Sequence, residues 1–183
     1  MRTSDVDIVI APGLGGGTDD HWYSRWERKL PTARRVVQAD WEAPRLADWT
    51  ERLVAVVEAA ERPVVLVGHS LGVLAIAHAA DRVAERVVGA FLVAAPSGRA
   101  LSAIEAVDPA FGEPRQTSLP FPAVLVASRD DPYSSYEESE ALAKVWHATL
   151  VDAGASGHLN NESGHGPWPE GLMRFAGFLK SLS

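Results

Sequence analysis

Residues 64–72 read Val64-Val65-Leu66-Val67-Gly68-His69-Ser70-Leu71-Gly72, and this stretch points to one architecture. Its first four residues are apolar without polar alternation, as in a strand of a parallel sheet whose two faces are both covered. The last five have the pattern G-x-S-x-G, and the apolar residues from Leu71 to Ala80 predict a buried helix. We therefore expect a strand, a sharp turn that carries Ser70, and a helix.

The rest of the chain alternates in the same way. Apolar runs predict five further strands, at residues 8–11, 35–39, 87–94, 123–127 and 148–151. Helical patterns are predicted at residues 48–60, 138–147 and from Pro169 onward, the first of them with Asp48 as its N-cap. The sequence therefore predicts an α/β fold with about six mainly parallel strands and helices on both faces.

The length suits a single domain, residues 1–183. The proline-bearing stretch Pro96–Pro122 has little periodicity and is too short for a large cap domain, so we expect an irregular excursion.

The 183 residues include 24 Asp and Glu against 17 Lys and Arg, a net charge of −7, and no cysteine. The lack of thiols excludes disulfides, thiolate metal sites and a cysteine nucleophile. The acidic balance argues against nucleic acid or an anionic membrane as a partner. No apolar run approaches the roughly 20 residues of a membrane span. The first residues do not resemble a signal peptide, so we expect a cytoplasmic protein. The oligomeric state is left open.

Ser70 has the setting of a nucleophile elbow, in which a strained turn between strand and helix lifts a serine hydroxyl above the sheet edge. A serine needs a base, and in this arrangement the acid and then the base follow the nucleophile at the ends of later strands. Asp131 follows the strand at residues 123–127, and His158 follows the one at 148–151. The rivals are Asp130 and Asp152 as the acid and His165 as the base.

The remaining histidines have simpler interpretations. We expect His69 to point away from the serine hydroxyl, His78 to pack in the core and His147 to end a helix. His21 precedes a helix and is expected to line the site. His158, Glu162 and His165 do not have the spacing H-E-x-x-H, so no metal and no cofactor are expected.

Pro12-Gly13-Leu14-Gly15-Gly16-Gly17 follows the first strand and is the expected source of an oxyanion donor. We expect the N–H groups of Leu14 and Leu71 to bind the oxyanion. A phosphate-binding loop is the competing interpretation, but no Lys-Ser or Lys-Thr follows the glycines.

Tryptophans are frequent near these loops. Trp26 and Trp49 are expected to pack in the core. Trp22 and Trp168 flank the oxyanion and histidine loops, so a place on the pocket wall is predicted for both.

Several of these segments together resemble one family. They are the glycine loop at residues 12–16, His21-Trp22, Gly68–Gly72, Ser128–Tyr133, Gly157–Asn160 and Gly166–Glu170. The chain resembles the small serine hydrolases related to retinoblastoma-binding protein 9, within the α/β-hydrolase superfamily. The resemblance implies a catalytic role for Ser70, Asp131 and His158. Substrate contacts are also predicted for His21, Trp22, Leu159 and Trp168.

The function predicted is hydrolysis of small ester or amide-like acyl substrates through an acyl-enzyme. Two alternatives remain at this point. The chain could be a binding protein on a hydrolase scaffold, because a fold alone does not prove an activity. It could also transfer the acyl group to an alcohol or amine, since the acyl-enzyme half of that reaction is the same.

Overall fold

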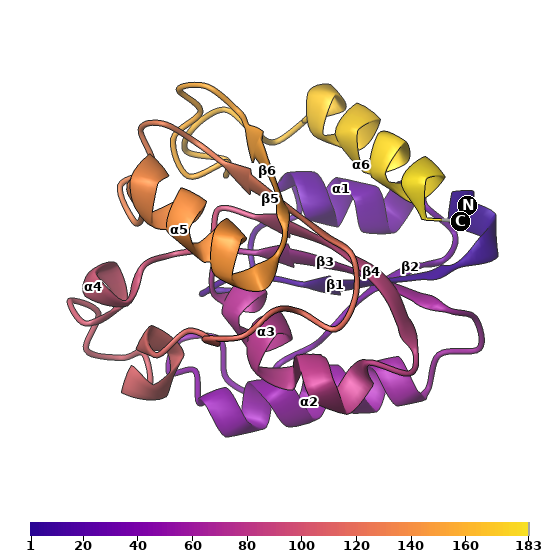
Figure 1. Ribbon diagram of the computed structural model, residues 1–183, viewed down its shortest axis with the longest axis horizontal. Helices are drawn as coiled ribbons and strands as arrows, with labels where there is room; N and C mark the ends of the chain where they lie inside the picture. Colours follow the sequence, from indigo (N-terminus) through magenta and orange to yellow (C-terminus); the bar gives the residue numbers. More distant parts are fainter. Residues whose placement is uncertain (183) are drawn as a thin grey trace.

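The computed structural model describes residues 1–182 (Figure 1). Six strands form one sheet in the order β2-β1-β3-β4-β5-β6, and every neighbouring pair is parallel. The strands are β1 (Asp7–Ala11), β2 (Ala33–Arg35), β3 (Val64–His69), β4 (Val87–Val93), β5 (Ala123–Ala127) and β6 (Thr149–Asp152). The predicted α/β class is confirmed.

Helices cover both faces of this sheet, as Figure 1 shows. One face carries α1 (Trp22–Lys29) and α6 (Pro169–Ser181), and the other carries α2 (Leu46–Glu58), α3 (Leu71–Val83) and α5 (Tyr136–Trp146). The short elements are α4 (Gly98–Leu101) and the 3₁₀ helices η1 (Thr3–Asp5) and η2 (Pro109–Gly112). The chain ends meet, because the N-terminal ammonium donates to the carbonyl oxygens of Leu179 and Leu182.

The two faces have different cores. The core between α2, α3 and the sheet is rich in Ala, Val and Leu, and α3 buries nearly every residue it has. The core under α1 and α6 is a group of interlocked rings, with Trp22 and Trp26 4.8 Å apart and Trp22 and Trp168 5.1 Å apart between ring centroids. Trp26 and Trp49 are both buried, as predicted.

Several element boundaries differ from those predicted. β2 ends at Arg35, so most of the strand predicted at residues 35–39 is loop. α2 begins at Leu46 and leaves Asp48 in its first turn, because the cap is supplied from a distance: the Leu46 N–H donates to Asp108. α5 begins at Tyr136, two residues earlier than predicted, with Ser135 and Glu138 forming a capping box.

The stretch Pro96–Pro122 is more ordered than predicted. It contains α4 and η2, which pack on each other where Gly98 lies against the carbonyl oxygen of Gly112. A Cβ at Gly98 would overlap that oxygen, so this contact needs a glycine. The stretch begins at the carboxyl end of β4, and four of its residues line the site described below.

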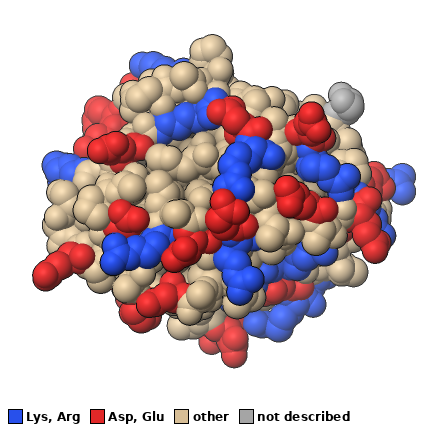
Figure 2. Space-filling model, turned by 90° about the horizontal axis from the view of Figure 1, so that it is seen from below, with Lys and Arg blue, Asp and Glu red and all other residues tan. Residues whose placement is uncertain are grey.

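Charges of both signs alternate on the face seen in Figure 2. Ion pairs join neighbouring elements, including Arg82 of α3 with Glu51 of α2, and Arg115 with Asp81 of α3. Lysines and arginines therefore have acidic neighbours there and do not gather into a basic patch. Within residues 1–182, no helix has the length and apolar character needed to cross a membrane.

Candidate active site

Ser70 lies in the sharp turn between β3 and α3, with φ at +53°. A positive φ is costly for a residue other than glycine and is kept only where the surroundings enforce it. Here the Ser70 N–H donates to the carbonyl of Val93, and α3 starts directly after the turn. Gly72 lets α3 approach β1, because a Cβ at this position would overlap the carbonyl oxygen of Ala11. The geometry is that of a nucleophile elbow.

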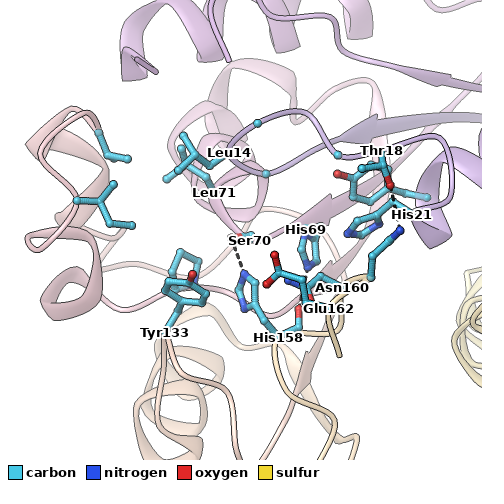
Figure 3. Close-up of a pocket in the computed structure, with 18 of the residues that line it drawn as sticks. Leu14, Thr18, His21, His69, Ser70, Leu71, Tyr133, His158, Asn160 and Glu162 are labelled. Atoms are coloured by element: carbon cyan, nitrogen blue, oxygen red, sulfur yellow. Dashed lines mark hydrogen bonds between the residues drawn. The ribbon is translucent and has the colours of Figure 1, made fainter. Parts of the chain in front are cut away.

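Three side chains form a hydrogen-bonded chain above this turn, and Figure 3 shows the contact between two of them, His158 and Ser70. His158 Nε2 lies 2.9 Å from Ser70 Oγ, and His158 Nδ1 lies 3.0 and 2.9 Å from the two carboxylate oxygens of Asp131. A carboxylate only accepts, so Nδ1 carries the proton and Nε2 accepts from the serine hydroxyl. The side chains of His158 and Asp131 are 8% and 3% exposed, which shields the pair from water.

The two rival carboxylates have other partners. Asp130 accepts from the Ser128 hydroxyl at 2.8 Å and from the Gly157 N–H at 2.7 Å. These hydrogen bonds lower the pKa of Asp130 and tie the acid loop to the start of the histidine loop. Asp152 is ion-paired with Arg129. Neither carboxylate has a hydrogen bond to His158 within the part of the chain that the structure describes.

The histidine loop is held from the side of the aromatic core. Leu159 is fully buried with φ at +52°, although leucine has no preference for that region. Trp22 compensates from α1, since its Nε1–H donates to the Leu159 carbonyl at 2.9 Å. His69 adds a second tie, with Nε2 3.0 Å from the His158 carbonyl. The backbone on both sides of the His158 ring is thus fixed.

Leu14 and Leu71 line the same cavity as Ser70, and Figure 3 shows both on one side of the serine. The glycine loop runs against the elbow, because a Cβ at Gly13 would lie 2.9 Å from Ser70 Cβ. Within residues 1–182, no hydrogen bond uses the N–H of Leu14 or of Leu71. Two donors without partners beside the hydroxyl suit the binding of a developing oxyanion.

A cavity of about 320 Å³ opens at Ser70. Leu14 and Leu71 lie on one side of Ser70 in Figure 3, and the apolar part of the lining also includes Pro96, Leu101, Ile104 and Val107. Thr18 and His21 lie on the other side, which is the polar end of the cavity; Tyr23 stacks on His21 and Asn161 donates to Thr18. The polar lining also includes Asn160, Glu162 and Glu42. This volume is at the small end of the range for ligand pockets, which favours a small substrate.

A family model described as "Serine hydrolase" matches residues 8–177. The chain belongs to the serine hydrolase family. A YdeN-like hydrolase from Pectobacterium atrosepticum is 33% identical over 98% of this chain and 94% of its own, with a TM-score of 0.88. The ydeN gene product of B. subtilis is 21% identical over 96% of this chain and 99% of its own, with a TM-score of 0.77.

A more distant structure shows how widely the fold is shared. Est1E from Butyrivibrio proteoclasticus, solved with ferulic acid, is 15% identical over 96% of this chain and 88% of its own, with a TM-score of 0.74. No curated protein matches the chain. The protein is thus an enzyme of the serine hydrolase type with the α/β-hydrolase fold, and residues 1–182 contain no large cap domain.

Three residues of this serine hydrolase that were expected on the pocket wall lie elsewhere. Trp22, Leu159 and Trp168 are buried in the aromatic core and do not line the cavity. The flanking position in sequence was a poor guide, because the rings pack behind the histidine loop and hold it from the rear. His21 does line the cavity.

Within residues 1–182, the other histidines have no hydrogen bond to the Ser70 hydroxyl. His165 contacts Ser163 Oγ through Nδ1 at 3.2 Å. His78 is half-buried on α3, and burial lowers its pKa. His147 is the C-cap of α5 with φ at +54°. His69 turns toward the His158 backbone, and burial holds its pKa well below the usual value.

Other lining residues gave little signal in the sequence. The centroids of the Tyr133 and His158 rings lie 4.5 Å apart. Leu101, Ile104 and Val107 also line the cavity, and they come from the stretch Pro96–Pro122, for which the sequence predicts no regular structure. The capping-box spacing of Ser135 and Glu138 is a signal for the start of α5, and it would have given the end of the acid loop more accurately. Among residues 1–182, no group of three or more His, Asp or Glu side chains is arranged to hold a metal ion.

Proposed function

We propose that Ser70, His158 and Asp131 are the catalytic triad of a hydrolase acting on small ester or amide-like acyl substrates. The observation that carries the proposal is the continuous chain of contacts from Asp131 through His158 to Ser70 Oγ, each at 2.9–3.0 Å. We also propose that residues 1–183 work as one catalytic domain. Kinship with the retinoblastoma-binding protein 9 relatives is part of the same proposal, supported by the sequence segments that suggested it.

In the first half-reaction, Ser70 Oγ attacks the acyl carbon while His158 Nε2 takes the hydroxyl proton. The carbonyl oxygen becomes an oxyanion and accepts from the Leu14 and Leu71 N–H groups, each worth about 2.7–4 kcal/mol if it behaves like known donors. Asp131 keeps the imidazole in the required tautomer and stabilises the imidazolium. His158 then protonates the leaving alcohol or amine, and Ser70 carries the acyl group.

In the second half-reaction, water attacks the acyl-enzyme. His158 takes a proton from the water, and the collapse of the second tetrahedral intermediate returns a proton to Ser70 Oγ. Transfer to an added alcohol or amine would follow the same steps, and product analysis with such nucleophiles separates the two outcomes.

Intact mass after treatment with a fluorophosphonate tests the nucleophile. One adduct is expected on the wild type and none on Ser70→Ala, with both proteins folded by circular dichroism. An unmodified wild type of native fold would overturn the proposal, as would an adduct on Ser70→Ala.

A further inference from the structure

The polar end of the cavity contains groups that the protein itself leaves without hydrogen bonds. His21 is 5% exposed and lines the cavity, yet within residues 1–182 neither of its ring nitrogens has a partner. Nδ1 is fully shielded, so Nε2 is the nitrogen left to face the cavity. The side-chain amide oxygen of Asn161, on the same lining, is also shielded and without a partner among these residues. Buried polar groups are normally satisfied, so a buried ring whose second nitrogen has no partner on the cavity wall indicates a ligand there.

The protonation of His21 can be derived from its surroundings. Burial, and then the nearby charges of His158, Arg35 and His165, lower the pKa of His21 to about 3. The ring is therefore neutral at working pH and carries one N–H. A proton on Nδ1 would be a shielded donor with no acceptor, which is costly. The proton belongs on Nε2, where His21 offers a donor to the cavity.

Tyr23 offers a second donor beside it. Its ring stacks on His21, with centroids 3.7 Å apart, and it lines the cavity. Burial raises the pKa of the phenol, so it stays protonated. No hydrogen bond of the Tyr23 hydroxyl occurs within the part of the chain that the structure describes. A Cβ at Gly17 would overlap this hydroxyl, so the glycine loop leaves room for it.

The charged residues on the cavity lining limit the chemical class of the ligand. The lining contains the carboxylates of Glu42 and Glu162 and, among the residues described, no lysine or arginine. Arg35, behind Tyr23, is already ion-paired with Glu27, so the carboxylates on the lining would repel an anionic group. A neutral carbonyl, ether or hydroxyl oxygen would accept from the donors. The opposite end, around Leu101, Ile104 and Val107, suits an apolar group.

We propose that the substrate is an amphipathic ester or amide, with a neutral oxygen on one side of the scissile bond that accepts a hydrogen bond from His21 and Tyr23, and a short apolar group on the other. This inference rests on the proposed function of Ser70. His21 and Tyr23 act here as specificity-determining residues and take no part in proton transfer.

The test uses pairs of esters that differ only by an oxygen in place of a methylene. On the acyl side the pair is 4-nitrophenyl methoxyacetate and 4-nitrophenyl butyrate; on the alcohol side it is 2-methoxyethyl butyrate and n-butyl butyrate. The kcat/KM ratio of oxygen to methylene ester is measured in the wild type and in His21→Phe, which keeps the stacked ring. Intrinsic reactivity cancels between the two proteins.

For one of the pairs, the ratio is expected to fall about fivefold in His21→Phe, the usual effect of one hydrogen bond. His21→Gln, which keeps a donor, should recover part of that loss, and Tyr23→Phe should lower the same ratio. Leu101→Ala, at the apolar end, should slow both members of the pair alike. If His21→Phe does not fold, Tyr23→Phe decides the question.

Unchanged ratios for both pairs in the folded variants would overturn the inference. Fluorophosphonate labelling of Ser70 in the same samples separates the two failures. A labelled enzyme with unchanged ratios disproves the specificity proposal alone, whereas an unlabelled wild type disproves the proposed function beneath it.

Discussion

Alanine, valine and leucine dominate the core between α3 and the sheet, whereas interlocked aromatic rings fill the space under α1 and α6. The first face carries the serine and the second carries the histidine loop. Ser70 lies in a turn that its own neighbours in sequence form, and backbone contacts with Val93 and Ala11 hold that turn. His158 is positioned by distant residues, Trp22 on α1 and His69 at the end of β3. The turn that carries Ser70 is thus a local sequence motif, whereas the position of His158 depends on side chains from distant elements.

The largest effect is expected within the histidine loop. His158→Ala should lower kcat/KM for an activated ester by roughly 10⁴-fold or more, since it removes the base that contacts Ser70. His165→Ala is the matched control, because His165 contacts Ser163 and not the serine of the elbow. It should change kcat/KM by less than about threefold, within the usual range for surface changes. The reverse pattern would transfer the base to His165.

The second effect compares a glycine on each face. Gly72→Ala should lower the free energy of unfolding by about 3 kcal/mol, because the new Cβ overlaps the Ala11 carbonyl of a neighbouring strand. Gly177→Ala lies inside α6 with no atom within 4 Å of the new Cβ, so it should raise stability by about 0.5–1 kcal/mol. Urea denaturation measures both, and equal changes would contradict the close approach at the elbow.

The third effect is the acid sensitivity of the aromatic face. The pKa of His21 is about 3 in the folded chain against about 6.5 when exposed, so the unfolded chain binds the proton first. The contribution of neutral His21 to the free energy of unfolding is therefore complete above pH 6.5, and it is lost as the pH falls toward 3. At pH 5 the loss is about 2 kcal/mol by linkage. Buried His69 adds to the loss in the same direction.

His21→Phe should reduce this pH dependence. Unfolding free energies of both proteins at pH 7 and pH 5 provide the measurement, and the wild type should lose about 2 kcal/mol more than the variant over that interval. Equal losses would show that His21 is solvated or paired in solution.

The local face is also the one that could be predicted from sequence. The strand, the elbow and α3 follow from residues 64–80, and the strand order places Asp131 and His158 at the same sheet edge as Ser70. The α/β class and the family were predicted correctly at the level that the comparisons show. Each of these depends on short-range pattern and the regular geometry of parallel sheets.

What the sequence did not predict depends on contacts between distant segments. Trp22 and Trp168 were placed on the pocket wall, but their rings pack behind the loop. The positive φ of Leu159 could not be predicted, because leucine has no preference for that region of backbone conformation. The cap of α2 comes from Asp108, more than sixty residues along the chain, so Asp48 was the wrong choice. Such partners are set by packing, and periodicity carries no information about them.

The smallest effect tests whether tertiary packing holds the base. Trp22→Phe removes the Nε1–H that satisfies the Leu159 carbonyl, and should lower stability by about 1–2 kcal/mol and kcat/KM by roughly tenfold as the loop loosens. Trp146→Phe is the matched control on the other face: its Nε1–H donates to the Arg115 carbonyl, also at 2.9 Å, and it is as deeply buried. It should cost similar stability with little change in kcat/KM, because Arg115 is not on the lining of the active-site cavity. If both variants lose activity equally, the aromatic core does not position His158, and the loss of activity follows from the loss of stability alone.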